Sequence, residues 1–121
     1  MRLRVEYGRE GSGNPEAIEV YAREEIRELT YKAMDEVLKA DISEAELMTI
    51  TRLVDSIAID LFSDEHVPHR LSDTITLSYQ SGGGSAKSCG GEAGSPQWDS
   101  LYEIWSAMSD LSRRYFIPRF Y

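Results

Sequence analysis

The feature that most constrains this chain is the apolar periodicity of residues 41–62, DISEAELMTITRLVDSIAIDLF. Apolar side chains recur there at the spacing of one face of an α-helix. A Ser-x-x-Glu pattern at Ser43 and Glu46 is typical of a helix start, and Pro68 lies shortly beyond the expected end. We therefore predict a long amphipathic helix at the centre of the core. Its buried face comprises Leu47, Ile50, Val54, Ile57 and Leu61.

The length and the cysteine content bound the class of protein. A chain of 121 residues fits a single domain, residues 1–121, that can bury a core without disulfides or metals. Cys89 is the sole cysteine, and the N-terminal sequence MRLRVEYGRE lacks the apolar stretch of a secretory signal. No apolar run approaches the length of a membrane span. These features predict a cytoplasmic protein with no membrane partner.

The net charge of −8 is unevenly distributed, because the whole excess of carboxylates lies within residues 1–66. Contacts to phosphates need Lys and Arg, so this balance argues against direct binding of duplex nucleic acid. Solubility is the ordinary explanation of an acidic surface. The functional alternative is an acidic protein–protein inhibitor or adaptor that acts through its helical surface, including the type that mimics DNA.

The N-terminal segments alternate apolar and polar residues, which predicts strands over Arg2–Tyr7 and Glu16–Ala22. The turn-forming sequence GREGSGNP joins them, so a β-hairpin is expected. The alternative for the second segment is a helix that begins at Asn14, with Pro15 at its first position. Its β-branched and aromatic side chains favour the strand.

Residues 23–40 show helical periodicity, which predicts a second long helix joined by a very short link to the helix of residues 41–62. Two long helices connected so tightly form an antiparallel hairpin. If their apolar faces exceed what a small sheet can cover, the remainder pairs with a second copy of the chain. We therefore expect a homo-oligomer, a dimer or larger. The apolar face of residues 23–40 comprises Ile26, Leu29, Ala33 and Val37.

The second half of the chain begins with a clear strand, TITLSY, over Thr74–Tyr79. Ser95–Pro96 is a typical helix start, for a helix that extends to about Arg114. The predicted fold class is therefore α+β. It has an N-terminal β-hairpin, a long antiparallel helical hairpin, one further strand, a flexible Gly/Ser-rich loop over residues 80–95, and a C-terminal helix with a short edge strand or tail.

Three patterns with catalytic or metal-binding potential each lack a necessary part. The spacing His66-x-x-His69 has no third ligand at a recognisable distance. Residues 82–88, GGGSAKS, look like a P-loop, but Ala86 replaces the glycine before the lysine and no helix follows. Cys89 has no histidine partner that the sequence can place beside it. We therefore predict no catalytic residue, no metal and no cofactor, and hence no enzyme activity.

The Gly/Ser-rich residues 80–95 have two interpretations. The first is a surface loop, which is the commonest role of such a segment. The second is a loop whose backbone N–H groups hold an anion, because glycine lets a ligand approach the backbone closely. Residues 113–121, RRYFIPRFY, supply a matching chemistry, because arginine binds phosphate bidentately and aromatic rings stack on bases.

Both segments flank the same predicted helix, so we expect them to converge on a pocket for a small phosphorylated ligand such as a nucleotide. Without a general base or a metal, such a site holds its ligand unchanged, which suggests sequestration. The predicted ligand-binding residues are Ser85, Lys87, Ser88, Tyr102, Arg113, Arg114, Phe116 and Arg119.

The order of these predicted elements, ending in the helix with the Arg/aromatic residues 113–121, resembles in outline a class of small phage proteins. These proteins sequester cyclic nucleotide immune signals, as the Thoeris anti-defence type does. The resemblance covers most of the chain and is one of element order. It implies a homo-oligomer without enzyme activity in the host cytoplasm. It also implies that a cyclic ADP-ribose-like or cyclic oligonucleotide ligand binds in a pocket closed by a loop.

Overall fold

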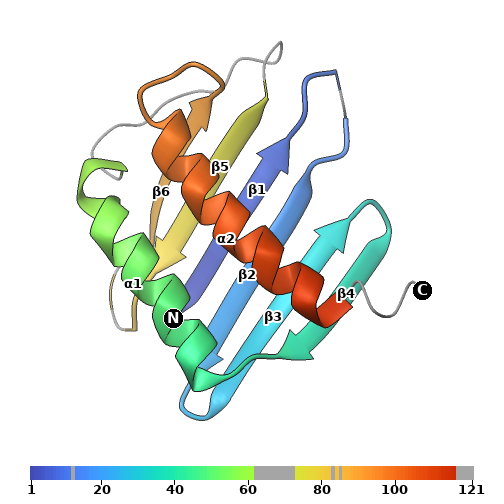
Figure 1. Ribbon diagram of the computed structural model, residues 1–121, viewed down its shortest axis with the longest axis vertical. Coiled ribbons are helices and arrows are strands. Elements are labelled where there is room, and N and C mark those ends of the chain that lie inside the picture. The colour runs from blue at the N-terminus through green and yellow to red at the C-terminus, as the bar shows by residue number, and fades with distance from the viewer. Residues whose placement is uncertain (12, 62–72, 83, 85, 117–121) are drawn as a thin grey trace.

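The structure is a computed structural model that describes residues 1–11, 13–61, 73–82, 84 and 86–116, with the backbone alone for 58–61. In this part of the chain, six antiparallel strands form one sheet in the order β4-β3-β2-β1-β5-β6, and two helices cover one of its faces (Figure 1). The elements are β1 Arg2–Gly8, β2 Glu16–Arg23, β3 Ile26–Ala33, β4 Glu36–Asp41, α1 Glu44–Leu61, β5 Thr74–Gln80, β6 Lys87–Glu92 and α2 Trp98–Phe116.

The predicted N-terminal hairpin is confirmed, because β1 pairs antiparallel with β2 and Val5 lies opposite Ile18. Both side chains are buried under the helices. Arg2 and Arg4 alternate with the buried residues of β1 and point to the opposite face of the sheet, which the helices leave open. The segment that follows Asn14 is therefore a strand and not a helix.

The predicted helix over residues 23–40 is wrong. This segment forms β3 and β4, a second antiparallel hairpin that extends the sheet outward from β2. There is consequently no long helical hairpin, and the expectation of an oligomer loses the surplus helical face on which it was based. The predicted α+β class holds, with a larger sheet and one helix fewer.

The turns of β2–β3 and β3–β4 explain why these two strands were not predicted. Each is a two-residue loop, Glu24–Glu25 and Met34–Asp35, as the pairing of the flanking residues shows. Glu24 and Met34 have positive φ values of 56° and 54°. Such loops usually contain glycine or asparagine, because those residues adopt positive φ at little cost. Glutamate and methionine, which occupy the positive-φ positions here, also favour helices.

Helix α1 begins with the predicted capping box. The Glu46 N–H donates to Ser43 Oγ at 3.1 Å, and the Ser43 N–H donates to Glu46 Oε1 at 2.9 Å. Tyr115 of α2 donates a further hydrogen bond to the Glu46 carboxylate. This carboxylate therefore ties the start of α1 to the last turn of α2.

Helix α2, and not α1, holds the centre of the core. It crosses the sheet diagonally over β6, β5, β1 and β2, whereas α1 lies to one side of it (Figure 1). No helix in the described part of the chain is long and apolar enough to cross a membrane. The buried residues of α2 include Leu101, Ile104, Trp105, Met108, Leu111 and Phe116.

The Gly/Ser-rich residues 80–95 are only in part a loop, because Lys87–Glu92 form the edge strand β6 paired with β5. A Cβ built on Gly91 would lie 2.9 Å from Leu101 Cδ1 and 2.9 Å from Ser95 Oγ. This glycine therefore lets the start of α2 pack closely on β6. At least one residue of the glycine-rich segment serves packing.

The capping box gives the first testable prediction. Replacement Ser43→Ala should lower the free energy of unfolding by about 0.5–2 kcal/mol, because the Glu46 N–H loses its acceptor. Urea denaturation measures this difference. The matched control is Thr49→Ala, since the Thr49 hydroxyl donates to the Ala45 carbonyl of the same helix and caps no helix end. An equal loss in both variants would contradict the capping role.

Candidate functional site

The structure distributes the predicted ligand-binding residues over two distant regions. Lys87 and Ser88 begin β6 at one edge of the sheet. The C-terminal end of α2 lies toward the other edge, where the Phe116 ring is 6.5 Å from the ring of Tyr31 on β3 (Figure 1). Three strands separate β3 from β6, a distance of about 19 Å at ordinary strand spacing. Ser85 and Arg119 lie outside the described residues.

The end of α2 therefore does not meet the described part of the glycine-rich segment. Arg113 and Arg114 occupy the last turns of α2. The cavity beside Arg114 is bordered by α1 and α2 alone, and Arg114 Nη1 lies 3.8 Å from Glu46 Oε2. The shared pocket expected from the sequence is not formed by these residues.

One cleft does combine two of the predicted residues. Tyr102 and Arg113 line a cleft of about 190 Å³ between α2 and the β1–β2 connection, which contributes Arg9. We name this surface, with the adjoining indole of Trp98, the aromatic–arginine patch. It consists of Arg9, Trp98, Tyr102, Trp105 and Arg113.

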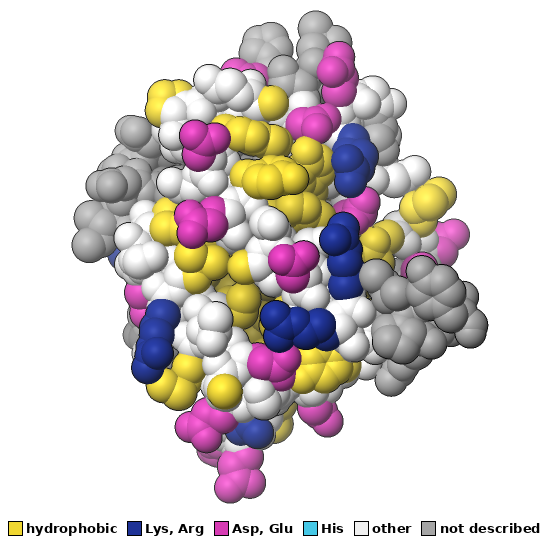
Figure 2. Space-filling model, in the orientation of Figure 1, with side chains coloured by type: hydrophobic (Ala, Val, Ile, Leu, Met, Phe, Trp, Pro, Cys, Tyr) yellow, Lys and Arg dark blue, Asp and Glu magenta, His cyan; other side chains and the backbone are white. Residues whose placement is uncertain are grey.

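Aromatic rings packed edge-on or at a tilt form the base of the patch. The Tyr7 ring centroid lies 5.9 Å from that of Trp98 and 5.2 Å from that of Trp105. Trp98 in turn lies 5.9 Å from Tyr102, which is 47% exposed. Such ring pairs contribute about 0.5–1.5 kcal/mol beyond their buried area. Figure 2 shows hydrophobic side chains gathered in the upper half of this face, with basic side chains in a line beside them.

The arginines of this region have only loose ion pairs. Arg9, Arg113 and Arg114 each have one carboxylate partner at 3.8 Å, and their side chains are 62%, 66% and 69% exposed. At that separation an exposed pair contributes roughly 0–1 kcal/mol. Arg4 on the open face, in contrast, bonds Glu19 at 3.0 Å. The guanidinium groups of the patch can therefore exchange these weak pairs with Glu16 and Asp110, which line the same cleft, for a bidentate bond to a carboxylate or a phosphate.

Asp73 holds the β1–β2 connection on both sides of Arg9. Asp73 Oδ1 accepts a hydrogen bond from the Glu10 N–H at 2.7 Å, and Oδ2 accepts one from the Tyr7 hydroxyl at 2.7 Å. The bond from the Glu10 N–H, with that from Tyr7, holds the pKa of Asp73 below its ordinary value. Burial raises the pKa of Tyr7 to about 12. Sequence reasoning missed Arg9 and Asp73, because both lie in connections without a motif.

Asp73 gives a prediction about pH. Because its pKa in the folded protein lies below the ordinary 3.8, the carboxylate stabilises the fold above that pH. This contribution is lost as the pH falls through the folded-state pKa. The free energy of unfolding of Asp73→Asn, measured in urea between pH 5 and pH 2, should therefore fall less steeply than that of the wild type. Parallel curves for the two proteins would contradict the assigned bonds.

The other candidate groups of the sequence offer little chemistry. Cys89 is 4% exposed on the helix-covered face, and burial raises the pKa of its thiol to about 11. It is therefore protonated at neutral pH, which does not suit a nucleophile. His66 and His69 lie outside the described residues. The residues that are described contain no group of three or more side chains placed to hold a metal.

The burial of Cys89 is directly testable. We expect the native protein at pH 7.5 to react with a chromogenic disulfide reagent at least about a hundredfold more slowly than the protein unfolded in urea, because the thiolate is scarce and enclosed. The measurement is the pseudo-first-order rate of reagent release. Equal rates in the two states would show an accessible thiolate.

Comparison of the chain with protein-family models, with curated proteins and with solved structures finds no match. The resemblance to nucleotide-sequestering phage proteins therefore stays a prediction. The function is therefore inferred from the chemistry of the patch.

Proposed function

We propose that this chain is a non-enzymatic protein-binding module, an inhibitor or an adaptor, that docks on its partner through the aromatic–arginine patch. The observation that carries the proposal is the composition of the patch. Exposed Tyr102 stands on a base of packed rings, between Arg9 and Arg113. Tryptophan, tyrosine and arginine are the residues that supply most of the binding energy at protein interfaces.

The size of the cleft favours a partner side chain over a whole small molecule. Sites that enclose drug-sized ligands measure roughly 300–1,000 Å³, and this cleft measures about 190 Å³. A carboxylate side chain of a partner can enter it and pair with Arg9 and Arg113, while a neighbouring apolar side chain packs on Tyr102. The partner segment is therefore acidic and carries an aromatic or aliphatic residue.

The charge of the whole molecule supports this orientation. The chain carries −8, whereas the cleft of the patch combines the exposed Arg9 and Arg113 with two carboxylates, Glu16 and Asp110. A partner with the complementary arrangement, an acidic segment within a basic surround, is drawn to the patch in one orientation. The acidic helical surface first considered for docking is smaller than expected, because residues 26–33 and 36–41 are strands. Lys32 and Lys39 there pair with Glu19 and Glu28.

The second candidate is sequestration of a phosphorylated ligand, and one observation favours it. Tyr102 and Arg113, two residues predicted to bind such a ligand, line the same cleft. A phosphate held between Arg9 and Arg113 places an attached base near Tyr102, where it can stack. The cleft holds only part of a nucleotide, which is why we rank this candidate second.

Substitution of the patch tests the proposal. Tyr102→Ala and Arg113→Gln should each weaken binding of the partner by about 30-fold or more, because truncating an interface anchor costs about 2 kcal/mol. Candidate partners are proteins that immobilised wild type enriches and both variants fail to enrich. Titration calorimetry with the purified partner then gives the affinities.

The matched controls are Met48→Ala and Arg52→Gln, two exposed residues of α1 outside the patch. They should leave the affinity within about twofold of the wild type, as expected for residues outside the interface. A partner that binds the patch variants as tightly as the wild type would refute this docking surface. Thermal stabilisation by nucleotides that Tyr102→Ala abolishes would favour the second candidate instead.

A further inference from the structure

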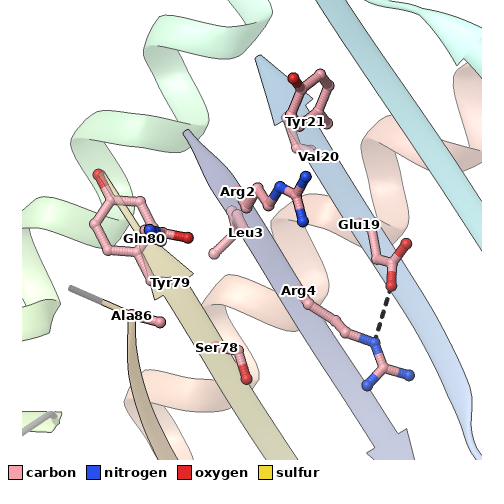
Figure 3. A pocket seen from close by; sticks show the side chains of 10 residues that line it. All are labelled: Arg2, Leu3, Arg4, Glu19, Val20, Tyr21, Ser78, Tyr79, Gln80 and Ala86. Carbon is pink, nitrogen blue, oxygen red and sulfur yellow. Dashed lines mark hydrogen bonds and ion pairs between the residues drawn. The ribbon is translucent and has the colours of Figure 1, made fainter. Parts of the chain in front are cut away.

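A separate group of basic side chains lies on the open face of the sheet, away from the helices. Arg2 of β1 lies between Tyr21 of β2 and Gln80 of β5 in the strand register. Arg23 follows two positions after Tyr21 and therefore points to the same face. Figure 3 views this region with the helices behind the strands.

These side chains border two adjoining hollows. One measures about 480 Å³ and extends from Arg2 and Tyr21 across Ser78. The other measures about 390 Å³ and extends from the same two residues to Arg23 and the glycine-rich segment at Gly82. Both share Arg2, Tyr21 and Gln80, so they form one recess around Arg2. Its size is that of sites that hold nucleoside-sized ligands.

The charges around this recess are not balanced. The guanidinium carbon of Arg2 lies 5.3 Å from the centroid of the Tyr21 ring. Within the described residues, no carboxylate lies within 4.0 Å of Arg2 or Arg23. Arg4, by contrast, has Glu19 at 3.0 Å and Glu6 at 3.3 Å. Figure 3 draws the Arg4–Glu19 bond and none to Arg2. The positive field of the recess therefore comes from Arg2 and Arg23.

The start of the glycine-rich segment closes one side of this recess. The Gln80 side-chain amide donates to the Gly84 carbonyl at 3.0 Å, and the Gly84 N–H donates to the Ser81 carbonyl at 3.0 Å. These bonds hold a turn beside Arg2. A Cβ built on Gly82 would meet no atom within 4 Å, so a ligand can approach the backbone there. The segment thus does border arginines, although not those of α2.

We propose that this recess on the open face binds a small organic phosphate of nucleoside size, held by Arg2 and Arg23 beside the turn of Gln80–Gly82. The phosphate oxygens bridge the two guanidinium groups, which suits phosphate because it offers several acceptor oxygens. The organic part lies in the larger hollow over Ser78. The site is on the opposite face from the aromatic–arginine patch. This proposal can therefore be tested independently of the proposed docking function.

Titration calorimetry of the full chain with ADP, pyridoxal 5′-phosphate, cyclic di-AMP, inorganic phosphate and adenosine tests the proposal. We expect at least one of the three organic phosphates to bind with a dissociation constant below about 1 mM. It should bind more tightly than inorganic phosphate or adenosine. Arg2→Gln and Arg23→Gln should each weaken that binding about tenfold, because each removes a charge-assisted contact.

The controls separate this site from the patch and from general charge effects. Arg52→Gln makes the same charge change on the helix-covered side and should leave the affinity unchanged. Arg113→Gln and Tyr102→Ala should also leave it unchanged; a loss in these variants would place the ligand at the patch and overturn the proposal. Failure of all three organic phosphates to bind would overturn it too, as would equal affinity for inorganic phosphate. Arg23→Gln provides the test if Arg2→Gln fails to fold.

Discussion

The packing of α2 on the middle strands is the interaction on which the rest of the structure depends. Leu101, Ile104 and Met108 are fully buried against β1 and β5, where Val5 and Leu77 are fully buried as well. Each such side chain contributes about 1.5–3 kcal/mol through burial. One layer of helices covers one face of the sheet, so the opposite face must be compatible with water.

The open face of the sheet is compatible with water mainly because it carries paired charged side chains. Glu19 on β2 accepts from Arg4 on β1 at 3.0 Å and lies 3.1 Å from Lys32 on β3, so one carboxylate links three neighbouring strands. Cross-strand pairs of this kind stabilise a sheet by about 0.2–1 kcal/mol each. Against this background, some of the described arginines differ, because their nearest carboxylates lie 3.8 Å away or farther. They occur at the end of the open face around Arg2, and on the other side of the molecule along α2.

The elements predicted correctly from the sequence are those in which the local pattern of apolar residues matches the pattern of buried side chains. Alternation placed β1, β2 and β5, and the helix start at Ser95–Pro96 placed α2. Alternation is weaker in β3 and β4, because they lie toward the edge of the sheet and expose Ile26 and Val37. Glu24 and Met34 then form turns without glycine. Local propensity favoured a helix there, and pairing with β2 overrode it.

The two candidate sites differ in how many of their residues a local sequence pattern can indicate. Tyr102 and Arg113 lie on one helix, and both were among the predicted ligand-binding residues, Arg113 because it belongs to the basic residues 113–121. Arg9 joins them only because Asp73 holds the β1–β2 connection against β5. Likewise, Arg2 meets Gln80 only through the register of β1 with β5, two strands separated in the chain by β2, β3, β4 and α1. The glycine-rich segment was a sound indication of an accessible backbone, but its basic neighbours are set by strand order. Strand β1 supplies these basic neighbours because β5 pairs with it in the sheet. No pattern within β1 or β5 indicates that the two strands pair.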